Sequence, residues 1–230
     1  EEPTSVARWL MLVEPVIRCA WGEGKLPLLV GGTGMYIKAL CDGLAAIPPV
    51  PEALRTELRA LDAVTVRERL EALDPIMATR LKPGDSQRNL RALEVMEASG
   101  VSLATWQEQT PPPLFPEATY HHFAATHPRE EVYRRIDQRF ETMMAHGALE
   151  EVRALVALGL DPELPIMRAH GVPELAAHLR GEMTLPDAIA QARQNTRNYA
   201  KRQMTWLRNQ LPDAIAVAPD ASPHTLLTQL

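Results

Sequence analysis

Glycines directly after a short apolar run could bring the backbone of this chain close to a substrate. Residues 26–30 are apolar, and Gly31, Gly32, Thr33 and Gly34 follow at once. Glycine lets a ligand approach the main chain, and a helix that begins behind the turn favours an anionic or oxyanion group. Thr33 would add a hydroxyl. The same residues could equally form a tight strand-to-helix connection without a ligand, and both interpretations stay open.

A second polar group lies at the start of an expected helix over residues 86–99. Gln87, Arg88 and Arg91 fall near its first turn, where the helix dipole disfavours arginine. A phosphate or a base edge would explain them, because Arg donates in bidentate fashion and Gln can pair with adenine. The alternative, favoured without other evidence, is a surface cluster in which the arginines pair with Asp85 and Glu94.

Residues 129–145 are expected to form another arginine-bearing helix. Glu131, Asp137 and Glu141 lie at helical spacing from its arginines, so salt bridges within the helix would explain most of these charges.

The expected helix over residues 186–209 carries a basic stripe. No acidic residue occurs between Asp187 and Asp213, so the positive charges of this helix are expected to be uncompensated. A polyanion is therefore the expected partner. Arg193, Arg197 and Lys201 recur every four residues, and Arg202 and Arg208 extend the set.

Arg168 and His170 lie in a turn-like segment, residues 168–173, that contains a glycine and could contact RNA. The seven histidines of the chain show no metal-ligand spacing, so we expect no zinc site.

Composition is that of an ordinary globular protein. The chain has 230 residues, 46% hydrophobic and 23% charged, which suffices for one large domain or a domain with a smaller insert. Its net charge of −5 argues against general nucleic-acid binding, so RNA would have to bind a local basic surface. The two cysteines suggest no disulfide framework, no apolar run approaches the ~20 residues of a membrane span, and we expect a cytoplasmic protein.

Proline clusters at residues 48–51 and 111–116 bracket a segment with helical periodicity and almost no strand signal. We interpret it as a helical insertion in an α/β core. The flanks predict strands at residues 26–30 and 120–125 and helices at 6–21, 35–44, 129–145, 148–158 and 186–209. Ser5 is the expected N-cap of the first helix, Gly147 and Gly159 are expected after two later ones, and the tail predicts a strand and a short helix.

Taken together, these stretches resemble the tRNA dimethylallyltransferase (tRNA isopentenyltransferase) family. The Asp-x-Gln-Arg…Arg-Ala-Leu-Glu-Val and Lys-Arg-Gln-x-Thr-Trp signatures are the most specific, and the order of the stretches covers nearly the whole chain. The matching residues are 28–36, 74–75, 85–95, 135–139 and 201–208.

The resemblance implies an α/β fold with a P-loop-kinase-like parallel sheet, incomplete at the N-terminus. Residues 1–47 and 117–230 would form this core, and residues 48–116 the inserted helical subdomain that grips the anticodon stem of tRNA. The implied reaction joins a dimethylallyl group from dimethylallyl diphosphate to N6 of the adenosine 3′ to the anticodon, after that base is flipped out. Mg²⁺ is the implied cofactor, and we expect a monomer.

Roles for individual residues follow from the same resemblance. Thr33 and Arg55 match positions that touch the tRNA near the reaction centre, and Arg139 matches an arginine that binds the diphosphate, with Gly31 and Gly32 beside it. Further tRNA contacts are expected at Gln87, Arg88, Asn89, Leu90 and Arg91, at Arg168, Ala169, His170, Gly171, Val172 and Pro173, and, from the basic stripe, at Arg193, Arg197 and Lys201.

Two departures from the family pattern stand out. The chain contains no complete Walker A loop and starts Glu-Glu-Pro without Met, whereas the family's P-loop and proton-accepting aspartate would lie upstream of Glu1. We therefore expect it to begin inside a longer gene product and to be inactive alone. Residues 171–173 read Gly-Val-Pro where many relatives carry Gly-Tyr.

Two other functions remain as alternatives. A small-molecule or nucleotide phosphotransferase would share the α/β core but leaves the insert and the basic stripe unexplained. An RNA-binding remnant without catalytic function is the non-enzymatic alternative.

Overall fold

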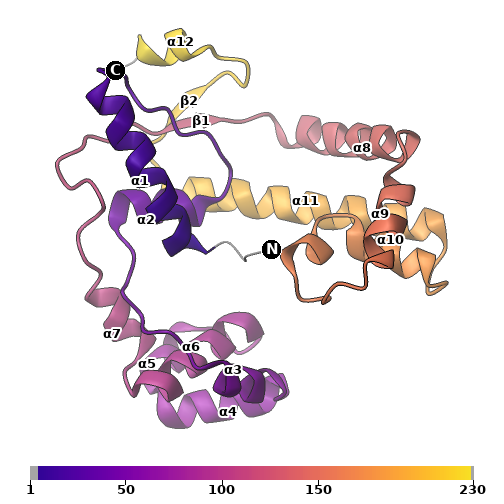
Figure 1. The fold of residues 1–230 in the computed structure, drawn as a ribbon, viewed down its shortest axis with the longest axis horizontal. Helices are drawn as coiled ribbons and strands as arrows, with labels where there is room; N and C mark the ends of the chain where they lie inside the picture. Colours follow the sequence, from indigo (N-terminus) through magenta and orange to yellow (C-terminus); the bar gives the residue numbers. More distant parts are fainter. Residues whose placement is uncertain (1–4, 229–230) are drawn as a thin grey trace. The chain divides into compact units, whose positions relative to one another are not determined.

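The computed structural model describes residues 5–228, which are mostly helical with a small parallel sheet (Figure 1). The chain divides into two compact units. Among the described residues, one unit comprises 5–8, 20–34 and 119–228, and the other comprises 9–19 and 35–118.

Short helices make up most of the unit formed by residues 9–19 and 35–118. A hydrophobic cluster holds them together, with Leu58, Leu70 and Leu93 fully buried at its centre. The helices are α3 (Glu52–Arg59), α4 (Ala63–Leu73), α5 (Pro75–Arg80), α6 (Ser86–Ser99) and α7 (Leu103–Glu108).

The boundaries of these helices follow from local chemistry. Asp62 accepts from the backbone N–H groups of Val64 and Thr65 at the start of α4, and Asp74 and Ser102 cap α5 and α7 in the same way. Helix α6 ends where Gly100 adopts a φ of 68°, a left-handed conformation that glycine takes without strain.

Two helices near the N-terminus flank the glycine turn. Helix α1 (Val6–Gly22) begins where the Ser5 hydroxyl accepts from the N–H of Arg8 at 3.1 Å, which confirms the predicted cap. Helix α2 (Gly34–Asp42) starts directly after Thr33. Trp9 and Tyr36 stack with their ring centroids 4.9 Å apart.

The other unit contains the sheet and the long helix α11. Strand β1 (Phe123–Ala125) pairs in parallel with β2 (Ile215–Val217), so the predicted α/β class is confirmed. The helices are α8 (Arg129–Ala145), α9 (Ala148–Ala157), α10 (Val172–Leu179), α11 (Leu185–Gln210) and α12 (Pro223–Leu227), with the 3-10 helix η1 (Pro165–Arg168) before α10.

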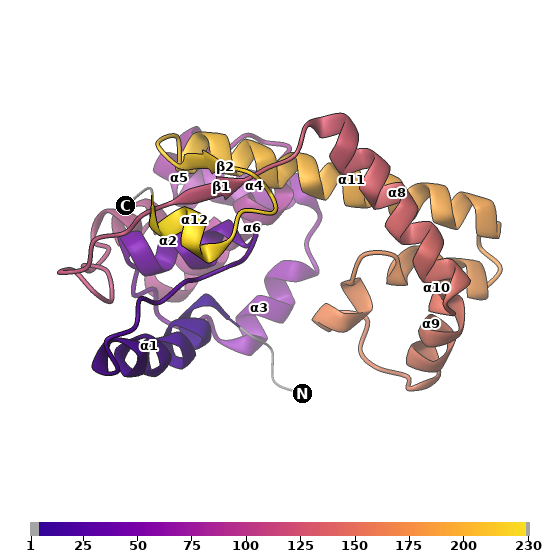
Figure 2. The same ribbon diagram turned by 90° about the horizontal axis from the view of Figure 1, so that it is seen from above.

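Helices α8 to α11 pack around a second hydrophobic cluster. Phe140 of α8, Val152 of α9 and Leu175 of α10 meet Ala188 and Ala192 of α11, both fully buried. The small alanines let the other helices come close to α11, and both views show α8 running beside it (Figures 1 and 2).

The predicted strand at residues 26–30 was wrong. Residues 26–30 form no strand, because no segment among residues 5–228 pairs with them. Their apolar side chains are consequently open to solvent, with Val30 90% exposed. A run of apolar residues predicts a buried strand only where a partner supplies the hydrogen-bond ladder.

Candidate functional site

The glycine turn of residues 31–34 lies against helix α11. The side-chain amide of Gln203 in α11 donates to the carbonyl of Gly32 at 3.0 Å. A Cβ atom added to Gly34 would lie 2.3 Å from Cδ2 and Cε2 of the Trp206 indole, closer than any real contact. The turn therefore requires glycine at position 34 because an aromatic ring occupies that space, and Thr33 stays exposed between the two contacts.

Arg139 differs from the other arginines of α8. Arg134 and Arg135 both hold Glu131, at 2.7 and 2.6 Å. Their hydrogen bonds, that of Arg134 first, lower the pKa of Glu131 to about 2. The exposed guanidinium of Arg139, by contrast, has no hydrogen-bond or ion-pair partner among the residues described. Arg139 is therefore available to an anionic ligand.

The basic stripe of α11 is only partly uncompensated, so that premise was wrong. Arg193 pairs with Glu141 at 3.0 Å, and Arg197 pairs with Asp137. Both acids belong to α8, and the sequence alone does not show that α8 packs on α11. Asp137 and Glu141 consequently stabilise the contact between two helices, whereas only Glu131 pairs with arginines of its own helix, as predicted.

Lys201, Arg202 and Arg208 keep charges that no acidic side chain of the described chain neutralises. All three are exposed, and the guanidinium of Arg202 lies 5.6 Å from the centre of the Tyr199 ring. The uncompensated part of the stripe is therefore the C-terminal half of α11.

A polar pocket of about 240 Å³ joins the predicted 168–173 stretch to α11. Glu174 is only 9% exposed in its wall, and one carboxylate oxygen accepts from Asn195 at 2.6 Å. The pocket thus brings together two of the predicted RNA-contacting segments. Its lining residues are Arg168, Ala169, His170, Pro173, Glu174, Asn195, Asn198 and Arg202.

The 168–173 stretch itself is held by local contacts. Arg168 pairs with Glu163, and the His170 ring lies 4.8 Å from that of Tyr199. Gly171 has a φ of 96°, and a Cβ there would lie 3.2 Å from the Phe140 ring. Val172 and Pro173 already belong to the first turn of α10.

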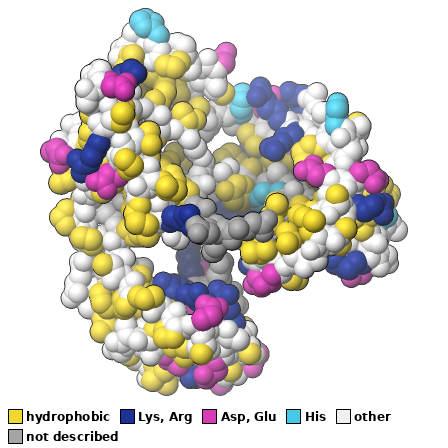
Figure 3. Space-filling view, viewed as in Figure 1, with side chains coloured by type: hydrophobic (Ala, Val, Ile, Leu, Met, Phe, Trp, Pro, Cys, Tyr) yellow, Lys and Arg dark blue, Asp and Glu magenta, His cyan; other side chains and the backbone are white. Residues whose placement is uncertain are grey.

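The start of α6 bears out the ion-pair interpretation. Arg88 lies 3.4 Å from Asp85, and Arg91 lies 3.3 Å from Glu94. Gln87 is exposed, and Arg88 keeps 75% of its side-chain surface in solvent. On the helices of residues 52–108, Lys and Arg side chains lie beside Asp and Glu side chains (Figure 3). The Arg88–Asp85 pair is exposed, and such pairs are weak, so Arg88 is able to exchange partners. The Glu94 side chain, by contrast, is only 6% exposed, so the pair that it forms with Arg91 is partly buried.

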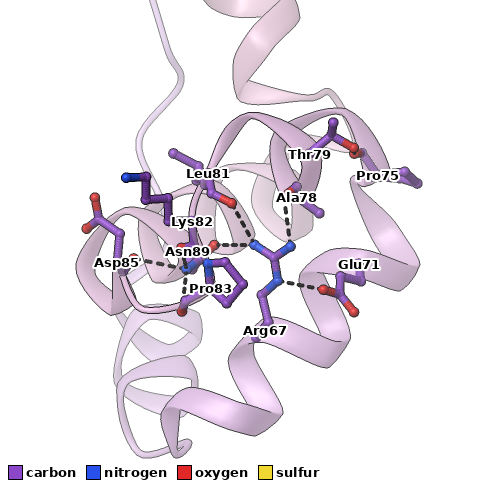
Figure 4. Close-up of polar contacts among 10 residues, drawn as sticks. All are labelled: Arg67, Glu71, Pro75, Ala78, Thr79, Leu81, Lys82, Pro83, Asp85 and Asn89. Atoms are coloured by element: carbon purple, nitrogen blue, oxygen red, sulfur yellow. Dashed lines mark hydrogen bonds and ion pairs between the residues drawn. The ribbon is translucent and has the colours of Figure 1, made fainter.

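Asn89 has a different place from its neighbours in the predicted RNA-contacting stretch. It is 1% exposed, and its amide donates to the carbonyls of Lys82, Pro83 and Asp85 (Figure 4). Its carbonyl oxygen accepts from Arg67 at 3.2 Å. The side chain is fully occupied in holding the loop before α6.

Arg67 is a residue that sequence reasoning missed. Its guanidinium also donates to the carbonyls of Ala78 at 2.8 Å and Leu81 at 3.1 Å, and it pairs with Glu71 at 2.6 Å (Figure 4). The only signal in the sequence was the Arg67–Glu71 spacing, which is typical of a solvated helix pair. Together Arg67 and Asn89 satisfy the backbone of residues 78–85, from which Gln87 and Arg88 follow.

The remaining predicted contact, Arg55, lies in α3 and pairs with Glu52 at 3.1 Å, with 31% of its side chain exposed. Thr33 and Arg139 belong to one unit, and Arg55 and residues 87–91 belong to the other. Within residues 5–228, no helix combines the length and apolar character of a membrane span.

Comparison with known proteins gives consistent matches over the chain. The family model described as IPP transferase matches residues 1–210. The tRNA dimethylallyltransferase of Azorhizobium caulinodans is 48% identical over 222 residues, covering 95% of this chain and 71% of that protein. The enzyme of the same name from Rhodospirillum centenum is 50% identical over 220 residues, covering 93% of this chain and 69% of that protein. Among solved structures, the tRNA isopentenylpyrophosphate transferase of Bacillus halodurans is 28% identical, with a TM-score of 0.62 over 99% of this chain and 72% of that one.

Proposed function

The chain belongs to the IPP transferase family, and from that premise we propose that it acts as a tRNA dimethylallyltransferase. It transfers a dimethylallyl group from dimethylallyl diphosphate to N6 of the adenosine 3′ to the anticodon. The match of the family model to residues 1–210, with identities near one half to relatives of that name, carries this conclusion.

The chemistry is a displacement at the allylic carbon. The lone pair of the adenosine N6 attacks that carbon, its bond to the diphosphate oxygen breaks, and the diphosphate leaves with the electron pair. The amine nitrogen, positively charged after the attack, then gives its proton to a general base, which is the role of the proton-accepting aspartate in the family pattern. Negative charge grows on the leaving group in the transition state, so a fixed cation aimed at it accelerates the step.

Arg139 suits that cation, because its exposed guanidinium has no partner among the described residues. We assign it to the diphosphate, with the main chain of Gly31 and Gly32. Thr33 is exposed at the end of the glycine turn, directly before α2, and we assign its hydroxyl to the target nucleotide.

We assign tRNA binding to surfaces on both units. The helical segment 48–116 contributes Arg55 and the start of α6, from Gln87 to Arg91, for which Asn89 provides the support rather than a direct contact. The other unit contributes the pocket at residues 168–173. Of the basic stripe, we assign Lys201, Arg202 and Arg208 to tRNA binding. Arg193 and Arg197 are no longer assigned to it, because they pair with acidic residues of α8.

We further propose that the substrate RNA is an anticodon stem-loop, because the modified adenosine lies there. We also propose that the enzyme is a monomer and acts in the cytoplasm. Mg²⁺ is expected from the family chemistry, where it would neutralise diphosphate charge. Residues 5–228 contain no group of three or more His, Cys, Asp or Glu side chains arranged to hold a metal ion. No ligand to it is assigned.

The test is transfer of labelled dimethylallyl diphosphate by the complete gene product to an anticodon stem-loop RNA. The matched control is the same RNA with guanosine at the target position. Label in the adenosine RNA alone supports the proposal. Label in neither RNA contradicts it, and label in both would contradict the assignment of N6 as the acceptor.

A further inference from the structure

We infer that Gln203 and Trp206 are positioning residues for the transfer reaction, and that they act by fixing the glycine turn of residues 31–34 on α11. This inference rests on the proposed function, in which Thr33 and the main chain of that turn meet the reacting groups. Neither side chain is needed for contact with substrate. Each sets the orientation of a backbone segment that glycine leaves free to move.

The Gln203 bond determines which way one peptide group faces. Its amide nitrogen donates to the Gly32 carbonyl at 3.0 Å. All peptide bonds described in the chain are trans, and in a trans peptide the N–H points opposite to the C=O. The N–H of Thr33, which belongs to the same peptide group, therefore points away from α11. It has no acceptor among the residues described, so it is presented for a ligand.

Trp206 fixes the other side of the turn. An added Cβ at Gly34 would lie 2.3 Å from two atoms of the indole and 2.6 Å from a third, so the backbone rests directly on the ring. A tryptophan ring cannot bend away as a long flexible side chain can. Gln203 and Trp206 lie three residues apart and so share one face of α11, which contacts the turn at two successive points.

Two contacts of this kind are needed because the turn is weakly restrained otherwise. Glycine has the largest backbone freedom of any residue, and three of the four turn residues are glycines. The flanking residues 26–30 are exposed and join no sheet in the described chain. An unrestrained turn would sample many orientations of the Thr33 peptide, and few would be productive. The loss would appear in kcat, because tRNA is bound by other surfaces.

The first test replaces Gln203 by leucine, which keeps the size of the side chain and removes the donor. The control is Gln210→Leu, an exposed glutamine on the same helix without a hydrogen-bond partner in the described part of the chain. We expect kcat to fall by about five- to tenfold for Gln203→Leu, as for one lost hydrogen bond, with KM for the stem-loop and the thermal midpoint unchanged. A rise in KM with unchanged kcat would overturn the inference.

The second test is a suppressor pair. Gly34→Ala places a methyl group where the Trp206 ring lies and should lower kcat by more than tenfold. Trp206→Leu should cost less alone, and the double variant Gly34→Ala/Trp206→Leu should recover activity relative to Gly34→Ala. If the fold-loss in kcat of the double variant equals the product of the two single fold-losses, the Trp206 ring does not determine the conformation of the turn.

Backbone NMR relaxation of residues 31–36 separates this inference from the proposed function. We expect lower order parameters for these N–H groups in Gln203→Leu and unchanged order parameters in Gln210→Leu, whether or not the protein transfers a prenyl group. Unchanged order parameters in both variants would overturn the positioning role even in an active enzyme. Absence of transfer by the unsubstituted protein, with lower order parameters in Gln203→Leu, would refute the proposed function and leave the restraint of the turn supported.

Discussion

Replacing Arg67 by methionine should destabilise the helical unit that contains α4 and α6. The substitution keeps a long apolar stem but removes every guanidinium contact. Arg67 is 16% exposed in its side chain and donates to the carbonyls of Ala78 and Leu81 and to the Asn89 side chain. Its salt bridge with Glu71 is on the exposed side, with 55% of the Glu71 side chain in solvent.

The magnitude follows from these contacts. A hydrogen bond from a charged donor contributes about 1.5–3 kcal/mol when half-buried, but three bonds from one group are not additive, and water can reach part of the loop. We expect a loss of about 3 kcal/mol in the free energy of unfolding. The matched control is Glu71→Gln, which breaks only the exposed pair and should cost about 0.5 kcal/mol.

Urea titrations of both variants, followed by circular dichroism, provide the comparison. The amides of residues 78–89 should also exchange faster in Arg67→Met than in Glu71→Gln. Equal midpoints for the two variants would refute the reasoning, because the carbonyl contacts of Arg67 would then contribute nothing beyond its surface ion pair.

The other predictions concern charge and reactivity. Replacing Lys201 and Arg202 by glutamine should reduce the slope of log affinity for tRNA against log salt by about two units, whereas Arg197→Gln should change it little because that arginine is already paired. Because the pKa of Glu131 is lowered from 4.5 to about 2, its contribution to stability is present above pH 4.5 and lost as the pH falls toward 2. In Glu131→Gln, the urea midpoint should therefore fall less between pH 4.5 and pH 2 than in the unsubstituted protein. A Glu131 carboxyl that titrates near pH 4.5 by NMR would contradict the lowered pKa. Burial and the neighbouring aspartate raise the pKa of the Cys41 thiol from 9.0 to about 11, so at pH 8 it should react with iodoacetamide about 100-fold more slowly than an unperturbed thiol. Equal rates would show that the thiol is not buried.

Much of the helical structure could be predicted because its signals are local. Helix α8 has the predicted bounds, and the glycines expected after α8 and α9, Gly147 and Gly159, have φ values of 91° and 60°. Helix α11 begins one residue before the prediction, since Thr184 supplies the cap and Pro186 occupies its second position. Caps and periodicity act within one or two turns, so a single sequence contains them.

What the sequence did not reveal depends on partners far along the chain. Residues 26–30 have the composition of a buried strand, yet strand formation requires a pairing segment that composition cannot identify. Arg197 looked uncompensated because its partner, Asp137, is sixty residues earlier and meets it only when α8 packs on α11. The predicted domain division and the site roles from Thr33 to Lys201 stay predictions.

The central claim is tested most directly by the modified nucleoside itself. The complete gene would be expressed in a bacterial strain that lacks its own prenylating activity, and total tRNA would be digested and examined by mass spectrometry. We predict that N6-dimethylallyladenosine appears with the gene and disappears when Thr33 and Arg139 are both replaced by alanine. Unmodified adenosine in tRNA from a strain that accumulates the folded protein would contradict the proposed function.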